Sequence, residues 1–523
     1  MFHNKSKAGI FFLLLVLFGC SSDGADSGET ADMSTEINSE ELRVALGALP
    51  PVLDSHMSMD TNGSIIGRNI FETLVTFDSN FTVQPMLAES WEQNDDGTTF
   101  TFNLRENVQF HNGKEMIAED VVASLERWIA VSTTGIDTFP EGTTLSSEGD
   151  HTVIMELPTP VSTILETLAY SGANFASIMP KEVIDEEDTT GVDTYIGTGP
   201  YKLEEWTQDQ YIHLSAYENY ESVAGESDGL SGERNTIIDN LYFMDVTDPA
   251  TREAGVETGE YDVAFDISYD SAERLGTVPH LNVNAHPFGM YVLTYNKDTG
   301  LFADERAREA ISLAISKEGI LQAAFTSEDY YTLDHSLMSG DQSELWSSDV
   351  GEQEYYEHNP EKAKQLLTDA GYTGEEITIL ASREHGYYYN GSVVLQQQLE
   401  QLGLNINLEI VEWSAYLELR ADPANWDLYL GASTPRISPT SLGFLRSEQP
   451  GWTNSSELDQ LVDEFNVATP DEAEELYEEL QAWFYEYKPV TKIADFSKVY
   501  ASNENVNYEF QDGPIFWDTS ITE

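Results

Sequence analysis

The stretch that decides the fold is residues 84–128, QPMLAESWEQNDDGTTFTFNLRENVQFHNGKEMIAEDVVASLERW. Asp95-Asp96-Gly97 predicts a turn, because aspartate and glycine adopt turn dihedrals at low cost. The alternation in Thr99–Leu104 predicts a strand with one buried face. A second turn, His111–Lys114, precedes a predicted helix with the acidic first turn Glu119-Asp120. Apolar residues then recur at helical spacing, namely Val121, Val122, Leu125, Trp128 and Ile129.

In this order the pieces resemble one family, the peptide-type solute-binding proteins of ABC importers, also called extracellular solute-binding family 5. The matching segments are Leu87 to Trp91, Asp96-Gly97, Phe100 to Phe102, Leu104-Arg105, Phe110 to Lys114 and Ala118 to Val121. The turn Gly197–Tyr201 and the segment Gly259–Phe265 continue the resemblance. It implies an α/β, two-lobed, periplasmic-binding-protein-like fold (type II, peptide-binding class) with a small extra subdomain on the first lobe.

The resemblance also implies domain boundaries. We expect the first lobe in residues 41–75, 192–287 and 490–523, the small subdomain in 76–191 and the second lobe in 288–489. The expected hinges are Ala285 to Tyr291 and Lys488 to Asp495. A length of 523 residues independently favours more than one hydrophobic core.

Local patterns place elements in the second half of the chain. Ile377–Ala381 and Leu404–Ile410 are predicted strands on either side of a helix at Ser392–Leu402, which favours an α/β lobe with a mixed sheet. Asn359-Pro360 and Thr469-Pro470 each predict a helix start, because proline fits the first helical position.

The charge balance restricts the partners. The chain has 25 basic and 93 acidic residues, a net charge of −68, so nucleic acid and anionic membrane surfaces are repelled. One interpretation is a solvated acidic coat of the kind that high-salt habitats favour, since salt screens self-repulsion. The other is selection for a cationic ligand. The acids are spread along the chain, which favours the acidic coat.

The N-terminus predicts export and a lipid anchor. Lys5 and Lys7 precede the apolar run Ala8–Phe18, which is typical of a signal peptide and too short to span a bilayer. The ending Leu17-Phe18-Gly19-Cys20 resembles a bacterial lipobox, which implies acylation of Cys20 after cleavage. Residues 21–40 are predicted to be a flexible tether. The expected location is extracytoplasmic, in the periplasm or at the cell surface.

Motifs of catalysis are missing from the sequence. It contains no Walker loop, His-Glu-x-x-His or Gly-x-Gly-x-x-Gly, and its Gly-x-Ser-x-Gly match at Gly225–Gly229 lacks the preceding strand pattern that a nucleophile elbow requires. The ten histidines are scattered, which disfavours a metal site built from neighbouring ligands. We therefore expect a protein that is not an enzyme, with no cofactor and no metal.

Two segments are predicted to bind ligand. Ser382–Asn390 lies between a strand end and a helix start, where α/β sheets place ligand groups. There Arg383 would hold a carboxylate, a role that the resemblance also implies for an arginine, and Tyr387 and Tyr388 would stack on the ligand or bond to it. The alternative is an arginine paired with one of many acids and tyrosines that fill a lobe surface.

The second segment, Gly431–Thr440, carries an aspartate for the ligand amino group in peptide-binding members. Here the sequence is Pro435-Arg436-Ile437, so recognition of a free amino terminus is in doubt. We hypothesise that Arg436 selects a ligand with a second anionic or carbonyl-rich end; a surface arginine paired with an acid is the alternative. By position in the family, Ser55, Met57 and Ser58 are further candidates, with a plain surface loop as the alternative.

The function implied is a monomeric, lipid-anchored solute-binding protein. It would capture a peptide or peptide-like small molecule between its lobes and deliver it to the membrane subunits of an ABC permease. Receptors for a metal chelate, an opine or an oligosaccharide on the same fold are alternatives, and a secreted two-lobed hydrolase is a further one.

Overall fold

The computed structural model of the chain describes residues 40–186, 191–338, 346–383, 385–434 and 436–522. The predicted signal peptide with Cys20 and nearly all of the tether lie outside these residues, as do Glu384 and Pro435 of the two candidate segments.

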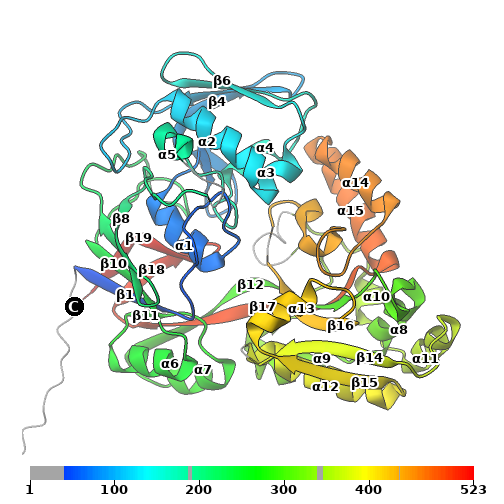
Figure 1. Cartoon of the computed structure of the whole chain (residues 1–523). Coiled ribbons are helices and arrows are strands. Elements are labelled where there is room, and N and C mark those ends of the chain that lie inside the picture. The colour runs from blue at the N-terminus through cyan, green and yellow to red at the C-terminus, as the bar shows by residue number, and fades with distance from the viewer. Residues whose placement is uncertain (1–39, 187–190, 339–345, 384, 435, 523) are drawn as a thin grey trace, which may run out of the picture. The chain divides into compact units, whose positions relative to one another are not determined.

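A mixed sheet is the central element of the fold (Figure 1). Parallel pairs join β14 to β15 and β16 and join β1 to β10 and β11, whereas the other neighbours are antiparallel. The strands in sheet order are β15 (Asn405–Val411), β14 (Glu376–Ser382), β16 (Leu428–Ser433), β12 (Leu281–Tyr295), β17 (Val490–Asn503), β11 (Val263–Ala264), β1 (Glu41–Leu46), β10 (Asn240–Asp245), β9 (Tyr211–Ala216) and β8 (Tyr201–Thr207), and β13 (Tyr331–Thr332) pairs with β17.

Strands β12 and β17 connect the two lobes. They pair from Leu281↔Asn503 to Thr294↔Val490, with irregularities after Pro287 and Tyr291. One end of β12 pairs with β16, and the opposite end of β17 pairs with β11. Figure 1 shows both strands running from the elements around α6 and α7 to those around α8 and α13. Strand β12 begins seven residues before Phe288, the expected start of the second lobe, because pairing with β17 extends it beyond its apolar half.

Each lobe has its own hydrophobic core. In the first lobe, β1, β8 to β10 and α1 (Thr61–Ile70) bury residues such as Leu42 and Phe243. The C-terminal hairpin of β18 (Val506–Phe510) and β19 (Pro514–Ile521) adds Trp517 to this core. In the second lobe, the helices of that half cover β14, β16 and β12, and Ile379 and Leu430 are buried beneath them.

The small subdomain contains the stretch that opened the sequence analysis. Its sheet has the order β4 (Ala88–Gln93), β5 (Thr99–Leu104), β7 (Thr152–Glu156), β6 (Thr144–Ser147), and β2 (Val75–Phe77) pairs with β3 (Val83–Pro85). Strand β5 matches the prediction, with Phe100, Phe102 and Leu104 buried on one face. Helix α2 (Ala118–Val131) also matches, and Trp128 is completely buried.

The remaining helices complete the two lobes and the subdomain. Their bounds are α3 (Thr133–Thr138), α4 (Ile164–Ala169), α5 (Lys181–Asp185), α6 (Pro249–Thr258), α7 (Tyr269–Leu275), α8 (Glu305–Ala314), α9 (Lys317–Phe325), α10 (Glu352–Tyr356), α11 (Pro360–Asp369), α12 (Gly386–Leu402), α13 (Trp413–Arg420), α14 (Ser456–Asn466) and α15 (Pro470–Tyr487). Asn359 and Thr469 cap α11 and α15, as predicted. In the described residues, no helix is long and apolar enough to cross a membrane.

Two of the motifs that resemble the family contact each other. The His111 backbone N–H donates to the Gly197 carbonyl over 3.0 Å, and His111 Nε2 lies 3.0 Å from the Gly199 carbonyl. Gly197 and Gly199 also pass close to the end of α1, where an added Cβ would lie 2.0 Å from the Ile70 oxygen at Gly197. The glycines therefore allow a close backbone crossing between the turn Gly197–Tyr201 and the end of α1.

We expect Gly197→Ala to lower the free energy of unfolding by about 1–3 kcal/mol, because the new methyl group would push on the Ile70 carbonyl and not on a movable side chain. Gly443→Ala is the matched control, since no atom lies within 4 Å of its added Cβ. Urea unfolding of both variants measures the difference. Equal stabilities would contradict the role of the close crossing.

Candidate functional site

The first candidate segment starts where β14 ends. Helix α12 begins at Gly386, six residues earlier than the predicted Ser392, so Tyr387 and Tyr388 lie in its first turn and not in a loop. The run of tyrosines has no helical periodicity of its own; packing of the rings on the second lobe extends the helix. Arg383 is exposed, and its guanidinium carbon lies 5.0 Å from the centre of the Tyr389 ring.

Tyr387 lies in an aromatic cluster that spans both lobes. Its ring centre is 5.8 Å from Phe325, 5.5 Å from Phe496 and 6.3 Å from Tyr269 of α7. Burial raises the pKa of Tyr387 well above its ordinary value, so its hydroxyl stays protonated and able to donate. Tyr388 is more buried, at 8% exposure, and its hydroxyl oxygen accepts the Ala432 N–H.

Asp266 and Tyr269 approach this cluster from the first lobe. Tyr269 donates its hydroxyl to the Ser497 carbonyl of β17 over 2.7 Å. The Asp266 side chain keeps 37% of its exposure and lies 2.9 Å from the ammonium group of Lys498. Burial would raise the pKa of Asp266. The positive charge of Lys498 lowers it below its ordinary value, with smaller contributions from Arg252 of α6 and from His385 of the second lobe. A charged carboxylate therefore faces the start of α12.

Asp266 and Tyr269 were missed by the sequence analysis. Asp266 follows the very short strand β11 and has a φ of 51°, a conformation that few residues other than glycine adopt. The sequence did carry a signal for Asp266, because the segment Gly259–Phe265 ends one residue before it. Residues that follow a strand end are candidates for ligand binding, and this is the rule that selected Arg383.

The second candidate segment reaches the small subdomain. Arg436 hydrogen-bonds to Tyr170, which follows α4, and burial is the main reason that the pKa of Tyr170 is raised. Ile437 packs against the core of the subdomain, and its carbonyl accepts the Trp346 indole N–H over 3.3 Å. Arg436 therefore lies between the second lobe and the subdomain, with a tyrosine hydroxyl as a partner.

The side chains of Ser55 and Ser58, in the third candidate segment, form hydrogen bonds within the protein. Ser55 and Ser58 are buried; the Ser55 hydroxyl bonds to that of Ser177, and the Ser58 hydroxyl accepts the Asp60 N–H. Met57 is 43% exposed. Of these three candidates, Met57 presents its side chain to solvent.

Direct contacts also join the second lobe to the subdomain. Arg446 forms an ion pair of 2.6 Å with Asp137 of α3, and the Ser162 N–H donates to the carbonyl of Asn466 over 3.2 Å. The second lobe therefore contacts the small subdomain directly as well as through Arg436.

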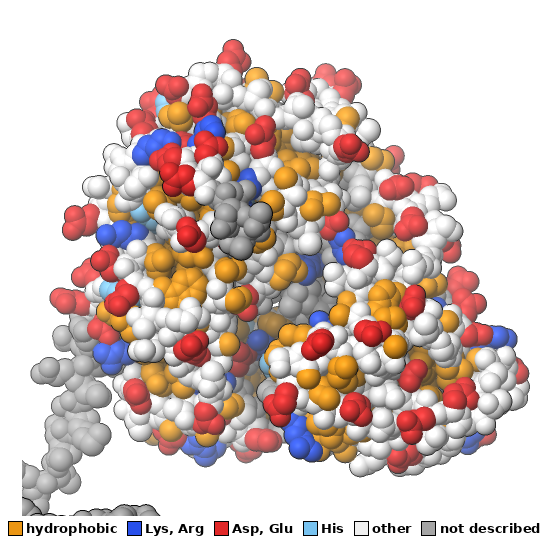
Figure 2. Space-filling view, viewed as in Figure 1, with side chains coloured by type: hydrophobic (Ala, Val, Ile, Leu, Met, Phe, Trp, Pro, Cys, Tyr) orange, Lys and Arg blue, Asp and Glu red, His pale blue; other side chains and the backbone are white. Residues whose placement is uncertain are grey.

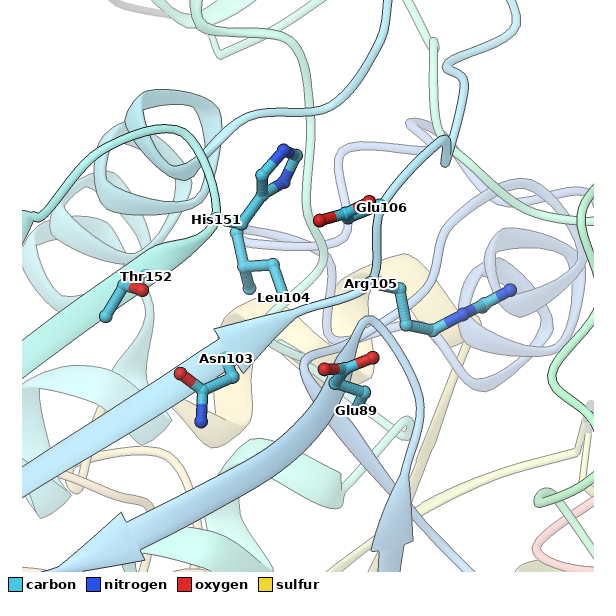
Figure 3. A pocket seen from close by; sticks show the side chains of 7 residues that line it. All are labelled: Glu89, Asn103, Leu104, Arg105, Glu106, His151 and Thr152. Carbon is cyan, nitrogen blue, oxygen red and sulfur yellow. The ribbon is translucent and has the colours of Figure 1, made fainter.

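A separate depression of about 500 Å³ lies on the small subdomain. It is lined by Glu89, Asn103, Leu104, Arg105, Glu106, His151 and Thr152 (Figure 3). The Arg105 side chain points away from Asn103 and His151, and it donates to the carbonyls of Glu221 and Ser222. None of the ligand-binding candidates lines this depression.

The fold and the grouping of aromatic and charged side chains between lobes define a two-lobed solute-binding protein. A model of the bacterial extracellular solute-binding proteins, family 5 Middle, matches residues 82–454, and the chain belongs to this family. It is accordingly a binding protein and not an enzyme.

Known proteins of different binding types are similar to this chain. The probable peptide ABC transporter periplasmic-binding protein y4tO of Sinorhizobium fredii is 26% identical over 80% of this chain and 82% of its own length. Heme-binding protein A of Haemophilus influenzae is 26% identical over 92% of both chains. The oligopeptide-binding protein AppA of Bacillus subtilis, solved in complex with a nonapeptide, shares the fold with a TM-score of 0.77, 21% identity and coverage of 92% and 99%.

Proposed function

We propose that this protein is the receptor of an ABC importer and captures a peptide or peptide-like solute between its lobes. The observation that carries the proposal is the contact of Tyr387 of the second lobe with Tyr269 of the first, three residues from the charged Asp266. A solute that touches both groups would favour the conformation in which the lobes are close, because it binds that conformation more tightly. The permease would then accept the loaded form.

The proposal includes the anchor and the domains. Acylated Cys20 would anchor the protein to a membrane outside the cytoplasm, in the periplasm or at the cell surface, with residues 21–40 as the tether. The lobes would have the boundaries expected above, with motion at Ala285 to Tyr291 and Lys488 to Asp495. Figure 2 shows acidic side chains spread over the visible face, which supports a solvated coat suited to high salt.

Ligand identification is the direct test. Native mass spectrometry of the protein purified from its own host would reveal a bound solute, and thermal-shift titration with peptides, heme and nickel–histidine would rank the classes. We expect an intact peptide-like molecule. A metal chelate, opine or oligosaccharide would replace the ligand class in the proposal, and release of a cleaved product would overturn it.

We expect Arg383→Ala to weaken peptide binding by about 1.5–3 kcal/mol, because a charge-assisted hydrogen bond to the ligand carboxylate would be lost. Arg436→Ala should cost more than about 1 kcal/mol if its guanidinium holds a second anionic or carbonyl group. Isothermal titration calorimetry with the recovered ligand measures both. Arg306→Ala is the control, since Arg306 pairs with Asp304 on the surface of the second lobe.

If neither variant differs from this control, the ligand does not bind through these arginines. In that case the two arginines are surface cations without a role in binding. The next residues to substitute are the remaining predicted ligand contacts, Ser55, Met57, Ser58 and Tyr388.

A further inference from the structure

Buried cations gather where α15 passes into β17. Lys297, Arg308, Lys317 and Lys492 are each no more than 8% exposed, and Lys488 is half-buried. Such a concentration is unusual for a chain with only 25 basic residues and a net charge of −68.

Two of these cations are explained by the end of α15. Arg308 donates to the Tyr487 and Lys488 carbonyls, and Lys297 donates to the Pro489 carbonyl over 2.8 Å. The C-terminus of a helix carries roughly half a negative charge, which favours cations there. Lys317, Lys488 and Lys492 remain, and they surround a small cavity together with Ser312, Tyr355 and Thr491.

Two of the three ammonium groups, those of Lys317 and Lys488, are incompletely compensated, although that of Lys317 also lies 4.5 Å from the centre of the Tyr355 ring. Within the described residues, Lys317 and Lys488 have no carboxylate within 4.0 Å, and each bonds to one backbone carbonyl, of Tyr355 and Tyr485 respectively. Lys492 contacts the Ser336 carbonyl and lies 2.8 Å from Asp495. Because an ammonium group has three N–H donors, Lys317 and Lys488 each retain donors for a further acceptor.

The more distant charges do not remove the excess. Glu318 near Lys317 is exposed, and Glu309 and Glu357 near Lys488 already contact Lys362, at 2.9 Å and 3.8 Å. Glu354 also acts on Lys488 from a distance. Burial lowers the pKa of Lys317 to about 8, which shows how poorly the charged form is solvated there.

The cavity limits the size of the occupant. The cavity has a volume of about 10 Å³, which is enough for a single water molecule. A phosphate, a carboxylate ligand or a peptide is too large. Chloride is only slightly larger than water and accepts several N–H donors at once.

We propose that this cavity is a halide site, occupied by chloride, which Lys317, Lys488 and Lys492 hold at the base of β17. The ion would join α9, the end of α15 and the start of β17, which is one of the two strands between the lobes. This site is separate from the candidate residues for solute binding, and its test does not depend on the identity of the solute.

Thermal unfolding at constant sodium concentration tests the proposal, with gluconate replaced stepwise by chloride. We expect the Tm of the mature protein to rise by a few degrees with the logarithm of chloride concentration, and bromide to act alike, since only the folded state has the site. Lys317→Met and Lys488→Met should lose this increment. The control Lys364→Met removes an exposed cation of α11 and should keep it.

Crystals soaked in bromide give a second readout that needs no variant. An anomalous peak among the three ammonium groups is the expected result. A cavity that holds only water would show no peak and no difference between chloride and gluconate, and either finding overturns the proposal. An equal chloride increment in Lys317→Met and wild type would also overturn it.

Discussion

Replacing Arg127 by alanine is expected to lower the free energy of unfolding by about 3–5 kcal/mol, the cost of leaving a buried charge without its partner. Both side chains of the pair are 3% exposed, and the guanidinium of α2 meets the Asp54 carboxylate at 2.6 and 3.1 Å. Among the described residues, Asp54 would retain the N–H groups of His56 and Val192 as donors. The pair ties the segment before α1 to the subdomain.

A double-mutant cycle with Asp54→Ala separates the pair from the loss of packing. The double variant should be less destabilised than the sum of the single variants, because removing both charges leaves neither uncompensated. Lys181→Ala is the control, as its pair with Asp185 is exposed and should contribute little. Urea unfolding of the wild type and of all four variants measures these differences. Additive effects would show that the charges do not stabilise each other.

The second large effect is expected from acidification. Burial lowers the pKa of His56 and of His111 to about 4, from about 6.5 in the unfolded chain. Above pH 6.5 both histidines are neutral in both states, so they add no pH dependence. As the pH falls from 6.5 to 4, only the unfolded state binds these protons, and each histidine should cost about 3 kcal/mol of stability.

The acidic coat works in the opposite direction, because protonation of its carboxylates reduces self-repulsion. The histidine contribution is therefore measured as a difference between the wild type and the variant His56→Gln/His111→Gln, whose side chains do not titrate. This difference in unfolding free energy should be constant above pH 6.5. Below pH 6.5 the wild type should become progressively less stable relative to the variant. A constant difference down to pH 4 would show that neither histidine resists protonation.

Sequence alone predicted the family, the fold class and most elements. Thr99–Leu104 and the helix at Ala118 follow from periodicities of two and 3.6 residues, which local backbone geometry imposes. The caps Asn359 and Thr469 follow from the unsatisfied N–H groups at helix starts. Such signals are local, so they are visible in a short window of sequence.

Tertiary structure decided where elements extend and what meets what. Strand β12 lengthens to Leu281 through its pairing with β17, and α12 starts at Gly386 through the packing of Tyr387 on Phe325. Contacts such as Asp266 with Lys498, or Lys317 beside Lys488, join residues more than 150 positions apart. No periodicity encodes them, because they depend on how the strands β12 and β17 bring distant segments together.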